Sequence, residues 1–182
     1  MEYKKILFNK TSFEEVLRSA YETLDRECYG FLFGEIVDKR GNRLWVVESA
    51  HPVQLAKRYP CSSYPESERG NWSLSTKNIG GYHSHPPHRE QTDGVRTLEQ
   101  GNLVLSKEDK ELIKSLENHV EVVIAIKKVT RKSKIVDNPL VISGYLGYNG
   151  NLYRVDIGAY FHNGRIRKAL IEAPRSILRL MR

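Results

Sequence analysis

The stretch CYGFLFGEIVDKRGNRLWVVES, residues 28–49, contains two β-rich runs joined by a turn. Aromatic and β-branched residues fill Cys28–Val37 and again Arg43–Ser49, a composition that favours strands. Asp38–Asn42 between them has the polar and glycine-containing composition of a turn. We therefore predict a β-hairpin here and expect the rest of the sheet to form around it.

The residues before the hairpin indicate one strand and one helix. Tyr3–Phe8 is a short β-like run, and Ser12 and Glu15 then stand three residues apart, as in a helix capping box. Apolar residues recur at helical spacing from there to about residue 25, which predicts a helix with one core-facing stripe. The stripe consists of Phe13, Val16, Leu17, Ala20 and Leu24.

Beyond the hairpin, residues 52–75 are polar and rich in proline, glycine and serine, so we expect a long surface loop. A strand should end near His83, and Ser106–Asn118 has the spacing of a helix. Three further β-like runs are Val120–Val129, Leu140–Leu146 and Leu152–Phe161. These elements predict a strand-rich sheet packed by two helices, an α+β or mixed α/β fold.

The length and the distribution of charge indicate one domain with an extension. The chain has 182 residues, 40% of them hydrophobic, which is enough for the core of one domain, placed at residues 1–162. Residues 163–182 carry six basic residues and one acidic residue, interleaved with apolar ones. We predict a basic amphipathic C-terminal extension that docks on this domain, on a second copy to give a homodimer, or on another partner.

The formal net charge of +7 fits an acidic protein partner as well as a nucleic acid. No helix-turn-helix, RNP or Cys/His finger motif is present, so nucleic-acid binding is not expected. No apolar run approaches the roughly 20 residues that cross a bilayer, and the charged start does not resemble a signal peptide. We expect a cytoplasmic protein with no membrane association, in which Cys28 and Cys61 are free thiols.

His83 and His85 are the first candidate metal ligands. Residues i and i+2 of a strand project on the same side, so two imidazoles at this spacing can share one metal ion. A histidine pair followed by proline is common without a metal, and a third ligand is therefore needed.

Asp109 is the candidate third ligand because it interrupts an apolar stripe. Leu112, Ile113 and Leu116 lie on the same helical face, so the carboxylate is expected to face the core. Burial of a charge costs several kcal/mol unless it is paired or binds a metal. The alternative is that Ser106 and Asp109 only cap this helix.

Two histidines, one carboxylate and a water form the four-coordinate arrangement of a catalytic zinc site. Zinc lowers the pKa of its water to about 7 and polarises the scissile carbonyl. Glu27, expected at the end of the first helix, can act as the general base. The alternative is an ordinary solvated glutamate.

Three segments together resemble the JAMM (MPN+) zinc metalloprotease family in order and residue type: ECYGFLFG at 27–34, HSHP at 83–86 and SKED at 106–109. The similarity spans about residues 3–129. The resemblance implies a single curved mixed sheet flanked by helices, of the cytidine-deaminase-like kind. It also implies one zinc ion with ligands His83, His85 and Asp109, Glu27 as the base and Ser106 as a donor to the oxyanion.

One spacing departs from the family, because 19 residues separate Pro86 from Ser106. Asp93 is a rival ligand nearer to the histidines, but it lacks the preceding serine and the following amphipathic helix, so we prefer Asp109. Residues 87–105 are then a loop beside the site, predicted to act as a mobile lid. His88 within it is expected to be a solvated histidine and not a fourth ligand.

The resemblance implies an isopeptidase or peptidase that removes ubiquitin-like β-grasp modifiers from proteins or processes their C-termini. A chain of this size is similar to the small, stand-alone prokaryotic members. Three alternatives stay open: a zinc amidase that acts on a small molecule or short peptide, a catalytically silent MPN scaffold, and a basic nucleic-acid binder.

Overall fold

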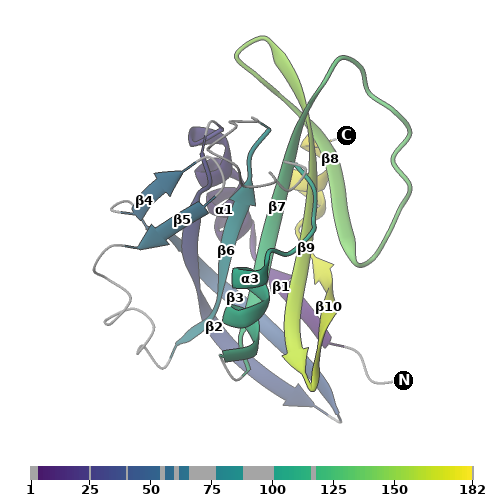
Figure 1. Ribbon diagram of the computed structural model, residues 1–182. Coiled ribbons are helices and arrows are strands. Elements are labelled where there is room, and N and C mark those ends of the chain that lie inside the picture. Colours follow the sequence, from purple (N-terminus) through teal and green to yellow (C-terminus); the bar gives the residue numbers. More distant parts are fainter. Residues whose placement is uncertain are drawn as a thin grey trace.

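The structure is a computed structural model that describes residues 4–24, 26–39, 41–53, 56–59, 62–65, 77–87, 101–115 and 118–181, with backbone alone at 56–59 and 62–65. This part of the chain forms ten strands and three helices (Figure 1). The strands are β1 (Lys4–Phe8), β2 (Tyr29–Lys39), β3 (Asn42–Pro52), β4 (Ala56–Tyr59), β5 (Ser62–Pro65), β6 (Asn78–His85), β7 (Val120–Val129), β8 (Val141–Tyr148), β9 (Asn151–Asn163) and β10 (Arg165–Glu172). The helices are α1 (Lys10–Glu22), α3 (Lys107–Ser115) and α4 (Arg175–Leu180).

Seven of the strands close into a β-barrel. Their hydrogen-bonded order is β10-β1-β3-β2-β6-β7-β9, and β9 pairs in turn with β10. One edge of β9 is shared, because β8 pairs with residues 151–158 and β10 with residues 159–163. The pairs β1–β10, β1–β3 and β6–β7 are parallel, and the other pairs in the barrel are antiparallel.

The predicted fold class is wrong. We expected an α/β or α+β fold built on a single curved sheet flanked by helices, whereas the protein is mostly β, and α1, the longest described helix, has only 13 residues. The difference arises at Arg165–Glu172, which pairs with both β9 and β1. Pairing on both sides removes two free edges from the sheet. No local sequence pattern of this segment shows that it has two partners.

The C-terminal segment is part of the barrel and its core. After β10, α4 places Ile177 and Met181 among the buried residues of the main core. The carbonyl oxygen of Met181 also accepts the N–H of Tyr145 in β8. We predicted that residues 163–182 dock on this domain, on a second copy or on another partner. The described part of this segment docks on its own domain.

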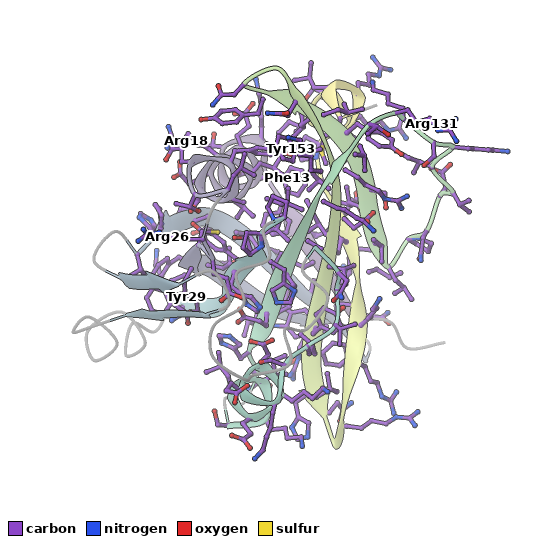
Figure 2. All side chains as sticks on the ribbon, turned by 45° about the horizontal axis from the view of Figure 1, so that its top comes forward. Phe13, Arg18, Arg26, Tyr29, Arg131 and Tyr153 are labelled. Atoms are coloured by element: carbon purple, nitrogen blue, oxygen red, sulfur yellow. The ribbon has the colours of Figure 1, made fainter. Side chains whose placement is uncertain are left out.

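The inside of the barrel is filled by alternate residues of the strands. Val122, Ile124 and Ile126 of β7 pack with Val155 and Ile157 of β9 in one cluster of buried side chains. This cluster also includes the stripe of α1, which lies behind β6 in Figure 1, whereas α3 lies in front of the sheet. Phe13 of α1 and Tyr153 of β9, both labelled in Figure 2, belong to this cluster. The residues between the inward ones, among them those of the candidate site, are on the outer face.

The hairpin prediction is confirmed, since β2 and β3 pair antiparallel along their whole length. α1 begins earlier than predicted. Asn9 is its N-cap, with Oδ1 accepting the N–H of Ser12 at 2.8 Å, so Ser12 is inside the helix.

Residues 52–75, expected to be a loop, include the antiparallel ribbon of β4 and β5. None of the described helices is long and apolar enough to cross a membrane.

Candidate metal centre

The two histidines of the HSHP motif lie at the end of β6, on the outer face of the barrel. Tyr82 between Gly81 and His83 belongs to the core, so His83 and His85 project on the opposite side. Their Nε2 atoms lie 3.2 Å apart. β6 is hydrogen-bonded to β2 on one side and to β7 on the other, which gives both imidazoles a rigid base.

Each histidine is held through its Nδ1 atom. His83 Nδ1 lies 2.8 Å from Oε1 of Glu121, and His85 Nδ1 lies 2.7 Å from the carbonyl oxygen of Asn102. Both partners accept hydrogen bonds, so in the neutral rings each Nδ1 carries the proton and each Nε2 offers a lone pair to the other ring. Lone pairs this close repel unless a proton or a cation lies between them. Histidines held in this way by a carboxylate or a carbonyl are typical metal ligands.

Asp109 joins the histidines from the first turn of α3. Its Oδ1 lies 3.5 Å from His83 Nε2, and one donor atom from each of the three side chains lies within 4.8 Å of the others. Ligand atoms at about 2.0–2.2 Å from a tetrahedral zinc ion are separated by about 3.3 Å. The separations of 3.2 and 3.5 Å therefore suit such an ion with little movement.

The second oxygen of Asp109 caps the helix. Oδ2 accepts the N–H of Ser106 at 2.7 Å, and Ser106 Oγ accepts the N–H of Asp109 at 3.0 Å. The cap leaves Oδ1 directed at the histidines, so capping and metal binding do not compete. Asp109 itself is 18% exposed, and Ile113 is the fully buried residue of α3. Leu116, predicted on the same face, lies outside the described residues.

Glu27 lies in the connection that leads into β2. α1 ends at Glu22, so the expected position of Glu27 at the end of that helix is wrong. The neighbouring Cys28 is tied to β6, since its N–H donates to Ser84 Oγ at 2.9 Å and its carbonyl accepts the N–H of Ser84 at 3.1 Å. Ser84 stands between the two histidines, and this pairing brings the Glu27 carboxyl to their side of the sheet.

The cluster contains more carboxylates than cations. Burial raises the pKa of Glu27 to about 8, although His83 acts to lower it and Asp109 to raise it further. Burial would lower the pKa of His83, but the hydrogen bond and charge of Glu121, together with Asp109 and Glu27, raise it to about 9. No lysine or arginine among the described residues contributes to either shift. Without a metal ion, protons on Glu27 and His83 balance the charge at neutral pH, and a divalent cation would replace them.

The sequence predictions missed the residues that hold the ligands. Glu121 is fully buried, and hydrogen bonds from His119 and His83 outweigh its burial and lower its pKa, which keeps it ionised. A glutamate within the apolar run Val120–Ile126 is a signal that could have identified it. Asn102 acts through its backbone carbonyl, for which no sequence signal exists.

Several of the sequence predictions cannot be placed. Asp93 and His88 lie outside the described residues, and so does most of the predicted lid at 87–105. Among the described residues, the structure brings together Glu27, His83, His85, Ser106 and Asp109, the complete set predicted from the motifs. Cys28 is buried and makes no disulfide, whereas Cys61 is outside the described part.

Comparisons with known proteins show no family for this chain. No family model matches it, and no curated protein matches it. Among solved structures it is similar to the solution structure of protein DSY2949 from Desulfitobacterium hafniense, with 17% identity and a TM-score of 0.46 over 93% of this chain and 92% of that chain. A likeness at this level does not carry a functional conclusion, so the side chains of the site are the basis for one.

Proposed function

We propose that the protein is a zinc-dependent hydrolase that cleaves amide bonds, with His83, His85 and Asp109 as the metal ligands. The observation that carries this proposal is the convergence of two histidine Nε2 atoms and one carboxylate oxygen, while both Nδ1 protons are held on the far side. Three protein ligands leave a fourth position for water, which is typical of catalytic zinc sites.

The other two motif residues have roles that suit their positions. A zinc ion in the site would polarise the scissile carbonyl and lower the pKa of its water. Glu27 takes a proton from the attacking water and passes it to the leaving nitrogen. Its pKa of about 8 falls when a dication is close, so the base is ionised at neutral pH. Ser106 donates its hydroxyl hydrogen to the substrate oxygen that gains negative charge.

The substrate class in this proposal rests on the resemblance of the three motifs to the JAMM family. The bond cleaved is the isopeptide or peptide bond between a ubiquitin-like β-grasp modifier and a protein, or a bond in the C-terminal tail of such a modifier. We propose that this reaction takes place in the cytoplasm with one zinc ion per chain.

Zinc content and cleavage, measured on the same preparation, test the proposal. The protein should bind about one zinc ion per chain and release a β-grasp modifier from a linear fusion. Chelation should abolish cleavage, and added zinc should restore it. Cleavage of short peptides without cleavage of the fusion would indicate an amidase, and a chain that binds no zinc would contradict the proposal.

A further inference from the structure

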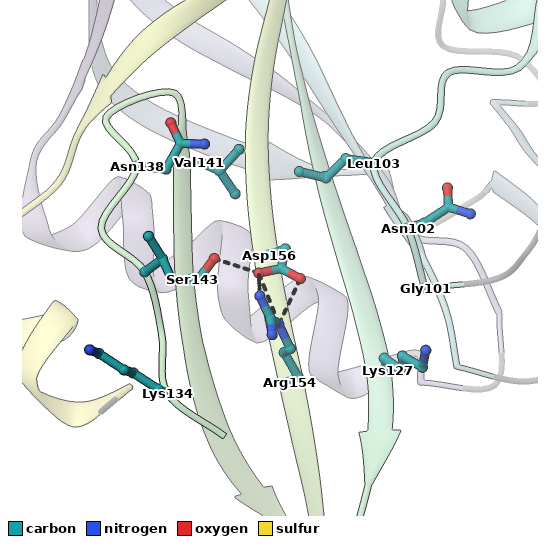
Figure 3. A pocket seen from close by; sticks show the side chains of 11 residues that line it. Gly101, Asn102, Leu103, Lys127, Lys134, Asn138, Val141, Ser143, Arg154 and Asp156 are labelled. Carbon is teal, nitrogen blue, oxygen red and sulfur yellow. Dashed lines mark hydrogen bonds and ion pairs between the residues drawn. The ribbon is translucent and has the colours of Figure 1, made fainter. Parts of the chain in front are cut away.

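The outer face of β7, β8 and β9 carries a basic pocket that the proposed reaction does not use. The pocket has a volume of about 610 Å³ and lies between residues 101–103, the connection that leads into β8, and outward side chains of β7 and β9 (Figure 3). Lys127, Lys134 and Arg154 line it, and Asp156 is the one acidic residue among the described residues of the lining.

The basic pocket is close to the metal centre and on the same face of the sheet. His85 pairs with Ala125 of β7, and Ala125 pairs with Asp156 of β9, so His85 and the pocket are two strands or about 10 Å apart. Asn102 separates them, since its carbonyl oxygen binds His85 while the residue also lines the pocket. An extended chain advances about 3.3 Å per residue, so three or four residues of a bound peptide would cover this distance.

Two lysines in the pocket have no acidic partner in the part of the chain that the structure describes. Lys127 and Lys134 lie on opposite sides of the Arg154–Asp156 pair (Figure 3). The Asp156 carboxylate already accepts from Arg154 Nε at 3.0 Å and from the Ser143 hydroxyl. Neither lysine forms an ion pair with any residue that the structure describes, so both are available to an anionic ligand.

The chain around the pocket adds to its positive charge. Residues 127–134, KKVTRKSK, contain five basic residues and no acidic residue. Most of these side chains are exposed, and Arg131 lies at the outer edge of the molecule in Figure 2. The basic charge of the protein is therefore concentrated beside the metal centre as well as in the C-terminal segment.

We propose that the basic pocket binds an acidic segment of the protein substrate and so holds the substrate beside the metal centre; this inference rests on the proposed function. The lining suits a peptide because lysines bind carboxylates, the amides of Asn102 and Asn138 can bond to a peptide backbone, and Leu103 provides apolar contact. It does not suit a nucleic acid, because none of the described residues that line the pocket is aromatic and could stack on a base.

Charge reversal of the two lysines tests the proposal. The probe is a fluorescein-labelled peptide with a run of glutamates, compared by fluorescence anisotropy with the same peptide carrying glutamines. Lys127→Glu with Lys134→Glu should weaken binding of the glutamate peptide at least about tenfold, because two attractions become repulsions. The matched control, Lys39→Glu with Lys114→Glu, changes the net charge equally at exposed sites away from the pocket and should stay within about twofold.

Several results would overturn the proposal. One is equal binding of the glutamate and glutamine peptides, and another is an equal loss of peptide binding in both double variants. A third is that a single strand of about 12 nucleotides binds through these lysines more tightly than the acidic peptide does. Unchanged zinc content and melting temperature in both variants show that any loss is local. If the protein binds the acidic peptide through these lysines yet holds no zinc and cleaves nothing, the proposed function fails and the pocket assignment stands.

Discussion

Glu121 is a fully buried carboxylate near the start of β7 that accepts hydrogen bonds from His83 and His119. Its burial is tolerated because both neighbours donate to it. Gly81, opposite it on β6, provides the space, since a Cβ atom there would lie 2.7 Å from Oε2 of Glu121. Glu121 therefore sets the orientation of His83 and of its Nε2 lone pair, although Glu121 is not among the three candidate ligands.

Glu121→Gln should weaken zinc binding by about 10- to 100-fold, because the neutral amide cannot accept equally well from both histidines and removes the charge that orients His83. Competition with a chromophoric chelator measures this affinity. Glu48→Gln, at an exposed position of β3, is the control and should bind zinc as the parent does. An unchanged affinity in the Glu121 variant would remove this residue from the site.

Glu27→Gln should keep about one zinc ion per chain and lose roughly 100-fold or more in rate, the order expected for a general base. The amide preserves the shape of the side chain but cannot take a proton. Metal content by mass spectrometry and cleavage of a modifier fusion are measured together, with Glu35→Gln as the exposed control. A variant that cleaves at the parent rate would contradict the role of Glu27.

Asp109→Ala should lose most of its zinc and some thermal stability, because it removes a ligand and the acceptor for the Ser106 N–H. Glu108→Ala changes an exposed carboxylate in the same turn of α3 and should retain zinc. Retention of full zinc by the Asp109 variant, together with loss of zinc in Asp93→Ala, would transfer the ligand role to Asp93.

At the scale of elements, α3 carries a ligand although it is too short to be stable by itself. It has nine residues, fewer than isolated helices need in water. The reciprocal cap between Ser106 and Asp109 stabilises its first turn. The fully buried Ile113 packs it on the sheet, in a small cluster with Val123 and Tyr160. This cluster is separate from the main core, so the position of Asp109 depends on few contacts.

Ile113→Ala should weaken zinc binding more than it destabilises the barrel, because the cavity forms beneath α3 and releases the helix locally. Ile157→Ala, in the main core, should instead reduce global stability by about 2–5 kcal/mol. Zinc affinity and denaturant unfolding of the two metal-free variants distinguish the effects. Equal affinities in the two folded variants would show that α3 stays in place without Ile113.

At the scale of the whole molecule, closure of the barrel depends on the last strand. β10 pairs with β1 at Leu170 opposite Lys5 and with β9 at Ala169 opposite Ala159. The ends of the chain are therefore joined side by side in one sheet. Loss of β10 leaves two unpaired edges, which are sites for aggregation.

Truncation after His162 should abolish cooperative folding or give soluble aggregates, because it removes β10 and the core residues Ile177 and Met181. Truncation after Ala173 keeps β10 and should fold with a lower melting temperature. Circular dichroism melting and light scattering compare the two with the full chain. A chain ending at His162 that melts like the full protein would contradict the role assigned to β10.

Local properties of the sequence were enough to predict the hairpin and most of the strands. Alternation of apolar residues and turn composition act over a few neighbouring residues, and β7 has the predicted bounds, Val120–Val129. The three metal ligands were predicted because their types have chemical reasons: His83 and His85 share a side of a strand, and Asp109 interrupts an apolar stripe. The roles of Glu27 and Ser106 were predicted from the resemblance of the three motifs.

Only the tertiary structure decided how these parts meet. Closure of the barrel requires pairing between residues as distant as Lys5 and Leu170, and the strand pattern of β10 contains no information about its partners. The contact between His85 and the carbonyl of Asn102 also depends on the tertiary structure. Every residue has a carbonyl group, and only the fold brings that of Asn102 next to His85. The basic pocket also exists only in three dimensions, since residues 101–103, the run 127–134 and Arg154 are far apart in the sequence.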